Sequence, residues 1–514
     1  MEKLYNNIEL NDNFAEKPSD AQNVPYLKNP PEVINITVGR QLFVDDFLIE
    51  ETNLKPEYHK AKKYEGNPIL KAETEIELDP APTACPKSGG VWYDEEDKKF
   101  KMWYEAGWLH YMAYAESDDG INWTRPSLDE KKGTNLILPY EGWPFSVDVK
   151  KGLDIKYLRP DSTTFIIDYD APKSEKYKMY LRSPGGLYPG VVATSGDGIH
   201  FENFTFSGDC GDRTTIFYNP FRKKWVDSIR KRGEEKRHRL YRERDHFLEK
   251  ARWEEGEAKS WMYTDELDEP NPYIGFEPHL YNVDCVGYES IMLGMFEIMY
   301  GPENDVTHYH GVPKINELIP MYSRDGYNFS RPSRESIINA SMYKGAWDRG
   351  YVQSVGGVTV INGDELWIYY SAYCGNEDYS DKKGTGDCNL CSGTYWGGAT
   401  GLAKMRRDGF VSLNGDGSIV TRKLEMSGKA SMHINAEGTV TAEILDAEGK
   451  VLAKSDSFSG DSTNAKLEFN DFDIKELSEK VFRIKFNVSG KLYSFGFADE
   501  KGDFGGAHAA GIVK

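Results

Sequence analysis

Pairs of short apolar runs that flank a polar turn recur along most of this chain. Five segments have this form, at residues 90–106, 164–183, 215–230, 291–301 and 357–373. Runs of this length, rich in β-branched and aromatic residues and bounded by Asp, Asn, Gly or Pro, are typical of β-hairpins. No helical periodicity is long enough to suggest βαβ units. The pattern predicts an all-β protein built from repeated hairpins.

A turn motif, Ser-x-Asp-Gly-x-x-aromatic, follows four of the five hairpins. Complete copies lie at 117–123, 195–201 and 323–329, and a shortened copy lies at 406–410. Asp-Gly supplies the positive φ of a tight turn, and the aromatic residue can pack back against the sheet. Two hairpins per unit give about four strands, which is one propeller blade. The repeats therefore predict a five-bladed β-propeller.

The sequence changes character after about residue 425. Short runs at 440–445, 466–469 and 482–486 are separated by Gly, Asp and Ser, which is typical of a β-sandwich. The first residues are polar with scattered Pro, as in an arm lying on the surface or on a partner subunit. We expect an N-terminal arm over 1–33, a five-bladed β-propeller catalytic domain over 34–425 and a C-terminal β-sandwich over 426–514.

The charge balance narrows the range of partners. A net charge of −20 and a pI near 5.1 would repel a phosphate backbone, so we expect no nucleic acid partner. The basic run from Arg230 to Arg244 is interrupted by Glu and is predicted to be a solvated loop or hairpin. No signal peptide and no membrane span are apparent, which predicts a cytoplasmic location, and a homo-oligomer stays open.

Cysteine usage gives a weak signal. Six cysteines in 514 residues do not make a disulfide framework. Cys388 and Cys391 form a CxxC with Cys374 upstream, but no fourth ligand for zinc stands nearby. We therefore expect no metal and no cofactor.

The chemistry of a propeller belongs at its axis, where the first strand of each blade lines a central channel. Glycosidic cleavage needs two carboxyl groups that flank the bond. Acids ahead of the predicted first strands are Asp161, Asp212 and Glu289, and Asp46 is a further candidate. The structural alternatives stay open: a strand-entry residue for Asp161, an ion pair for Asp212, a buried glutamate bound by Arg for Glu289, and a strand end for Asp46.

Other residues near these strand ends could form a sugar subsite. Aromatic faces stack on sugar rings, and polar side chains bind their hydroxyl groups, although packing within the sheets is the alternative for each. The candidates are Trp108, Trp347 and Tyr351 for stacking, and Arg213, Asp284, Asp348, Arg349 and Gln353 for polar contacts.

These features resemble the five-bladed propeller glycosidases, especially glycoside hydrolase family 32 and its family 43 and 68 relatives. That group implies an Asp nucleophile or base, an Asp that stabilises the transition state and a Glu general acid. Asp212 in GDRTT is similar to the Asp of an Arg-Asp-Pro motif in inverted order, and Glu289 in YES is similar to the Glu of a Glu-Cys motif. The Asn-Asp-Pro-Asn-Gly nucleophile motif is absent, with CPKSGG at 85–90 instead.

The resemblance and the placement of the acids predict a carbohydrate-active enzyme that hydrolyses a terminal furanoside or related glycoside in a funnel. Glu289 would protonate the leaving group, Asp161 or Asp46 would attack or activate water, and Asp212 would stabilise the transition state. One alternative is a glycoside phosphorylase, for which Arg213, Arg349 and Lys87 are the basic residues at hand. Another is a carbohydrate-binding propeller without catalysis.

Overall fold

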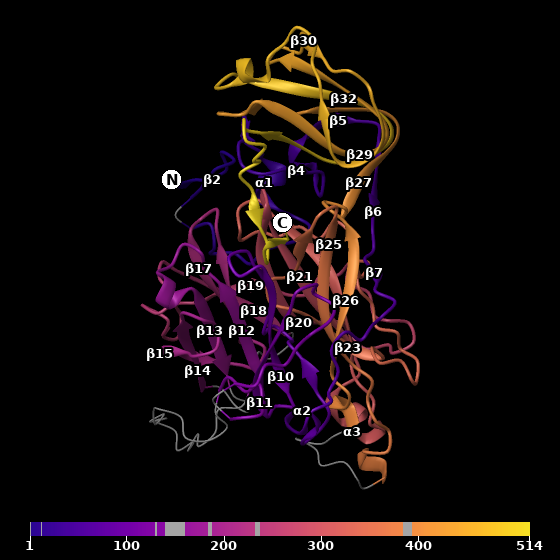
Figure 1. Cartoon of the computed structure of the whole chain (residues 1–514). Helices are drawn as coiled ribbons and strands as arrows, with labels where there is room; N and C mark the ends of the chain where they lie inside the picture. Colours follow the sequence, from indigo (N-terminus) through magenta and orange to yellow (C-terminus); the bar gives the residue numbers. More distant parts are fainter. Residues whose placement is uncertain are drawn as a thin grey trace.

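The computed structural model describes residues 2–11, 13–128, 131–138, 160–182, 188–231, 237–383 and 393–513. Five antiparallel sheets follow one another along the chain and are arranged around one axis, which makes a five-bladed β-propeller (Figure 1). The all-β propeller predicted from the repeats is confirmed. No helix within these described ranges is long and apolar enough to cross a membrane.

Each blade begins with its innermost strand and continues outwards along the chain. The first blade contains β8 (Ala84–Cys85), β9 (Val91–Asp94), β10 (Lys99–Ala106) and β11 (Tyr111–Ser117). The second contains β12 (Ser162–Ile167), β13 (Tyr177–Arg182), β14 (Tyr188–Ser195) and β15 (Glu202–Cys210). The third contains β16 (Thr215–Asn219), β17 (Lys224–Lys231), β18 (His238–Arg244) and β19 (Lys259–Met262).

The last two blades complete the ring. The fourth contains β20 (His279–Glu289), β21 (Ile291–Gly301) and β22 (Ile315–Ser323). The fifth contains β23 (Gly350–Ser354), β24 (Val360–Asn362), β25 (Glu365–Tyr373), β26 (Ala399–Arg406) and β7 (Lys62–Lys63). β7 comes before the first blade in the sequence but pairs with β26 of the last blade. Backbone hydrogen bonds between these two strands therefore close the ring.

The repeated turn motif stabilises the hairpins as its sequence predicts. In the first copy the backbone N–H of Gly120 donates to Ser117 Oγ at 2.9 Å, and that of Asn122 donates to Asp119 Oδ1 at 2.7 Å. Gly120 has a φ of +72°, which a side chain would disfavour. The copies that begin at Ser195 and Ser323 make the same bonds, so the motif is a structural element of the blades.

A ten-stranded sheet with its own apolar core lies against one face of the propeller, above it in Figure 1. It contains β3 (Ile34–Asn35), β4 (Gln41–Leu42), β5 (Ile49–Thr52), β6 (Lys55–Tyr58), β27 (Val411–Thr421), β28 (Leu424–Glu425), β29 (Ser431–Asp446), β30 (Val451–Lys454), β31 (Phe458–Leu467) and β32 (Phe482–Ala498). We call it the C-terminal module. The strands within residues 34–58, a range that the sequence assigned to the propeller, pair within the C-terminal module. The sandwich arrangement stays a prediction.

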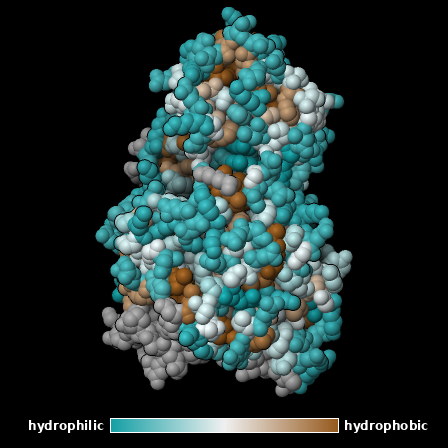
Figure 2. Space-filling view, viewed as in Figure 1, coloured by the Kyte–Doolittle hydropathy of each residue, from teal (hydrophilic) through white to brown (hydrophobic). Residues whose placement is uncertain are grey.

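The chain ends on the propeller. After β32 the chain returns from the C-terminal module to the propeller (Figure 1). There β33 (Ala507–His508) pairs with β20, and β34 (Ile512–Val513) pairs with β24. The short helices are α1 (Pro25–Lys28), α2 (Glu75–Leu78) and α3 (Asn304–His310), and β1 (Glu2–Lys3) pairs with β2 (Glu9–Leu10). The face in Figure 2 is mostly hydrophilic with small separate apolar patches, in keeping with the high net charge.

Candidate active site at the mouth of the channel

A carboxylate lies across the propeller axis and joins three blades. Asp284, on β20, accepts hydrogen bonds from Ser88 Oγ at 3.0 Å and Asn282 Nδ2 at 3.1 Å, and a further one from Ser354 Oγ. Burial raises the pKa of Asp284. This cross-tie divides the channel into a mouth, where the inner strands begin, and a far end, where they finish beside the C-terminal module.

Three residues at the mouth have left-handed backbone conformations although they are not glycine. Lys87, Arg213 and Tyr351 have φ values of +48°, +63° and +53° and come from the inner strands of the first, third and fifth blades or the residues just before them. Such conformations cost free energy and persist where the surrounding structure holds them, often at functional sites. The mouth therefore has backbone geometry that points to a function.

Arg213 lies at the centre of the mouth with unused hydrogen-bond donors. It is 2% exposed, and its Nη1 donates to the backbone oxygen of Asp161 at 3.1 Å. Its Nε and Nη2 are buried and have no partner among the residues that the structure describes. Burial acts to lower its pKa, but Tyr281 and Glu297 are close enough to hold the pKa above its ordinary value. A buried guanidinium with free donors requires water or a ligand.

Glu297, on β21, is a buried acid beside Arg213. Asn316 Nδ2 donates to its Oε1 at 2.7 Å, while Oε2 has no partner in the described part of the chain. Burial raises the pKa of Glu297 to about 8, and Arg213 opposes this shift. Glu297 is therefore protonated at neutral pH and can donate a proton, as a general acid must.

Asp161 supplies a second, more exposed carboxylate close to the same guanidinium. Its side chain is 14% exposed, and Arg182 Nη1 donates to its Oδ2 at 3.2 Å. Glu105 lies within electrostatic range of Asp161, but Lys87 Nζ binds it at 2.6 Å and burial raises its pKa. The mouth therefore combines a buried acid whose pKa is raised with a second, partly solvated carboxyl group.

Aromatic rings form one side of the mouth. Trp108 stacks on Tyr395 with ring centroids 4.0 Å apart and planes 6° from parallel. Lys87 Nζ lies 3.9 Å from the Trp108 ring, and Tyr373 contacts that ring edge-on. Tyr351 packs against Tyr395 in the same apolar cluster. These rings form an aromatic wall next to the polar groups, in which Tyr395 and Lys87 already cover the two faces of the Trp108 ring.

Several residues predicted from sequence lie at this end. Asp161, Arg213 and Trp108 belong to the group described above, and Asp212 precedes Arg213 but forms an ion pair with Arg230. Gln353 is buried on β23, next to Ser354, and neither of its amide atoms has a partner among the described residues. Asp284 is the axial cross-tie rather than an open polar group.

Glu289 lies elsewhere. It was expected ahead of the first strand of its blade, but β20 ends at Glu289 and β21 begins at Ile291, so this residue turns the chain at the far end. Arg407 Nη2 donates to its Oε1 at 2.8 Å, and the backbone N–H of Arg40 donates to Oε2 at 3.1 Å. Glu289 therefore joins the propeller to neighbouring segments, and the structural alternative, a buried glutamate bound by Arg, describes it better than the general acid.

Four other predicted residues are also away from this group. Asp46 is exposed in a short 3-10 helix next to β5. Trp347 packs on Tyr370, and Asp348 binds Lys63 Nζ at 2.6 Å on the outer strand β7. Arg349 binds Glu377 at 3.0 Å. Trp347, Asp348 and Arg349 directly precede the inner strand β23, but they do not lie at the axis. The reason is that the chain crosses the outer part of the fifth blade before β23.

Four residues at the mouth were not predicted from the sequence: Glu297, Glu105, Arg237 and Lys314. Glu297 could have been noticed as the lone acid in the apolar run IMLGMFEIMYG at 291–301. The described parts of the basic run from Arg230 to Arg244 pair as a hairpin, and within them Arg239 and Arg244 are buried rather than solvated. Alternate residues of this run point into the blade, which the charge pattern alone does not reveal.

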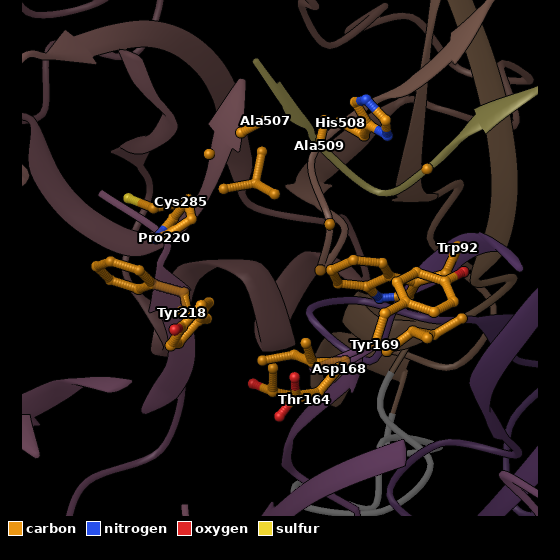
Figure 3. A pocket seen from close by; sticks show the side chains of 18 of the residues that line it. Trp92, Thr164, Asp168, Tyr169, Tyr218, Pro220, Cys285, Ala507, His508 and Ala509 are labelled. Carbon is orange, nitrogen blue, oxygen red and sulfur yellow. The ribbon is translucent and has the colours of Figure 1, made fainter. Parts of the chain in front are cut away.

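The far end of the channel holds a cavity of about 440 Å³, whose lining differs from the polar mouth. Figure 3 shows Trp92 and Tyr169 on one side, Tyr218 and Pro220 on the other, and Ala507 from the C-terminal segment above. Its lining is mainly apolar. Asp284 of the cross-tie is also among the residues that line it.

No cluster of three or more potential metal-ligating side chains occurs within the described ranges. Cys374 is half-buried next to Trp396. Cys388 and Cys391 lie outside the described residues.

Comparisons with known proteins give similarities of fold. No protein-family model and no curated protein matches the chain. An N-acetylgalactosamine deacetylase from F. plautii, solved with blood group B trisaccharide, is 15% identical with a TM-score of 0.43, over 70% of this chain and 96% of that one. A β-1,2-mannobiose phosphorylase from Listeria innocua is 13% identical with a TM-score of 0.40, over 67% and 96%. The Bombyx mori GH32 β-fructofuranosidase BmSUC1 is 11% identical with a TM-score of 0.33, over 89% and 95%. These values assign no activity to this chain.

Proposed function

We propose that this protein is a glycosidase that cleaves a glycosidic bond at the mouth of its propeller channel. The observation that carries the proposal is the position of Arg213, a buried guanidinium with free donors between Asp161 and the protonated Glu297. Two carboxyl groups of opposite protonation state are what glycoside hydrolysis requires. The aromatic side of the mouth gives a sugar ring an apolar wall.

Each group has a distinct role in this proposal. Glu297 donates its proton to the oxygen of the leaving group as the bond to the anomeric carbon breaks. Asp161 attacks the anomeric carbon or removes a proton from the attacking water. Arg213 orients the sugar through the N–H groups that have no acceptor among the described residues.

The closed channel favours attack at a chain end. Asp284 ties the first, fourth and fifth blades together across the axis, and the C-terminal segment pairs with the inner strands β20 and β24 beyond it. A saccharide that enters the mouth therefore meets a blind end. This geometry supports exo-acting cleavage of a terminal residue, and the furanoside preference expected from the resemblance belongs to the same proposal.

A panel of aryl glycosides and natural oligosaccharides tests the proposal. The panel includes terminal furanosides and pyranosides, and released sugar is measured for the wild type and for a double variant, Asp161→Asn with Glu297→Gln. We expect cleavage of at least one glycoside by the wild type and none by the double variant. Equal cleavage by both proteins would remove these residues from the mechanism.

The panel also addresses the carbohydrate-binding alternative. Binding is measured by calorimetry with the same glycosides. Sugar binding without cleavage of any of them would favour a binding propeller over an enzyme.

A further inference from the structure

Four basic side chains gather at one side of the mouth, around Tyr281. Arg237 lies with its guanidinium carbon 4.9 Å from the Tyr281 ring centroid, and Lys314 Nζ lies 5.7 Å from the same centroid. Arg213 is within electrostatic range of the Tyr281 hydroxyl group, and Arg230 is within range of Lys314. We call Arg213, Arg230, Arg237 and Lys314 the cation cluster.

Among the described residues, few carboxylates pair directly with the cation cluster. Asp212 pairs with Arg230, and Asp161 accepts from Arg182. Asp161 and Asp284 are within electrostatic range of Arg213, and Glu303 is within range of Lys314. Within the described ranges, however, Arg213, Arg237 and Lys314 form no ion pair with a carboxylate at contact distance.

Some donor groups of Arg213 and Arg237 are also unused within the described ranges. Lys314 is 2% exposed. Arg237 Nη1 and two N–H groups of Arg213 are buried without a partner among the described residues. An unpaired buried charge is costly, so a structure that keeps several together is suited to a ligand that supplies the missing negative charge.

We propose that the cation cluster binds an oxyanion, a carboxylate, sulfate or phosphate group, during the reaction at the mouth. This inference rests on the proposed glycosidase function and names the charge of what the site takes. Guanidinium groups present paired N–H donors that match the oxygens of such anions, and an ammonium group adds a point charge. Neutral sugars alone would leave these donors and charges uncompensated.

The oxyanion has two possible sources. It is either a substituent of the sugar, such as a uronate carboxylate or a sulfate ester, or inorganic phosphate that attacks in place of water. In the second case a phosphate oxygen bonds to the anomeric carbon, the bond to the leaving oxygen breaks, and that oxygen takes the proton of Glu297. The products are a glycosyl phosphate and an alcohol.

Binding to the full chain tests the site without depending on turnover. Calorimetry with sulfate, inorganic phosphate and glucuronate compares the wild type with Lys314→Met and Arg237→Met. The matched control is Lys404→Met, which removes a lysine near Trp367 on the outer side of the fifth blade. We expect at least one oxyanion to bind the wild type and the control, and the first two variants to lose at least tenfold in affinity. Thermal unfolding checks that each variant is folded.

Two results would overturn the proposal: no binding of any of the three oxyanions to the wild type, or equal binding by all four proteins. Cleavage of a neutral aryl glycoside with and without phosphate, and of its uronide and sulfated forms, then separates the two sources. A glycosyl phosphate product identifies free phosphate, and preference for the charged glycoside identifies the substituent. Oxyanion binding with no glycoside cleaved would sink the glycosidase proposal and leave the anion site standing.

Discussion

The two ends of the channel differ in how their buried glutamates are bound. At the far end Glu289 is bound by Arg407 and by the backbone of Arg40, and the cavity there is lined mainly by apolar and aromatic groups. At the mouth Glu297 keeps one oxygen without a partner among the described residues. A glutamate bound on both oxygens joins neighbouring segments, whereas one with an unused oxygen can contact a ligand.

A carboxylate near the axis is therefore not sufficient evidence of catalysis. Glu289 and Glu297 are both glutamates of the fourth blade, and both are buried. Glu289 has two basic partners, while Glu297 has one oxygen without a partner among the described residues. The predictions that follow test whether chemistry is confined to the mouth.

The largest effect is expected from Glu297→Gln. Glutamine keeps the shape and the contact with Asn316 but cannot donate the catalytic proton, so kcat should fall by about 10²–10⁴-fold. Steady-state kinetics on the best substrate measures the change. Glu317→Gln is the control, because Glu317 is a half-buried acid of the same blade with both oxygens bound, by Ser336 and Ala340. An unchanged kcat in the first variant would exclude Glu297 as the acid.

Asp161→Asn is expected to have the next largest effect. The amide cannot attack or accept a proton, so kcat/KM should fall by about 100-fold or more while the fold persists. Asp168→Asn serves as the control, since Asp168 lines the far-end cavity. If both variants lose activity equally, the contrast between the two ends does not hold.

Glu289→Gln should change stability and leave catalysis intact. Loss of the charge leaves Arg407 without its ionic partner, although Arg40 keeps Asp408, and this lowers the free energy of unfolding by about 3 kcal/mol. Denaturant unfolding measures stability, and kcat is measured per folded molecule. A drop in kcat with no loss of stability would return Glu289 to the role of general acid.

The pH dependence should report Glu297. Its pKa is about 8 because burial outweighs Arg213 and Arg239, while Asp284 adds to the rise. The protonated form is active, so activity falls above pH 8 in the wild type, by about tenfold for each further pH unit. The raised pKa also means that the native state holds this proton from about pH 4.5 to pH 8, and its stability contribution declines over that window. The pH profile of the residual activity of Glu297→Gln should lack this decline above pH 8.

A smaller effect is expected for sulfate affinity. Burial, together with Arg237 and Arg230, lowers the pKa of Lys314 to about 7, and Glu303 opposes this shift. Lys314 is charged below pH 7, so sulfate, whose charge is constant in this range, should bind several-fold more weakly at pH 8 than at pH 6. Calorimetry at both values measures this, and Lys314→Met should show no such difference. An equal slope in that variant would assign the effect to another group.

Much of the fold could be predicted because its signals are local. Asp119 and Gly120 form their turn through bonds to residues two or three positions away, so the motif has the same meaning wherever it occurs. The site was predicted in part for a similar reason. Asp161, Asp212 and Arg213 stand directly ahead of inner strands, and the propeller brings such positions to one end of the channel.

Other positions depended on contacts that no local pattern encodes. Glu289 and Glu297 could not be told apart because the residues 279–301 form one long apolar stretch, and the two-residue turn at Glu289 decides which strand faces the axis. Lys314 and Arg237 come from different blades and meet only around Tyr281.

The sequence by itself determined an all-β chain of five repeated units and placed several acids at strand entries, because period-two alternation and Asp-Gly turns act over a few residues. Only the tertiary structure decided which acid is satisfied and which is left with a free atom. That distinction depends on partners hundreds of residues away, such as Arg407 for Glu289, and on burial, which moves the pKa of Glu297.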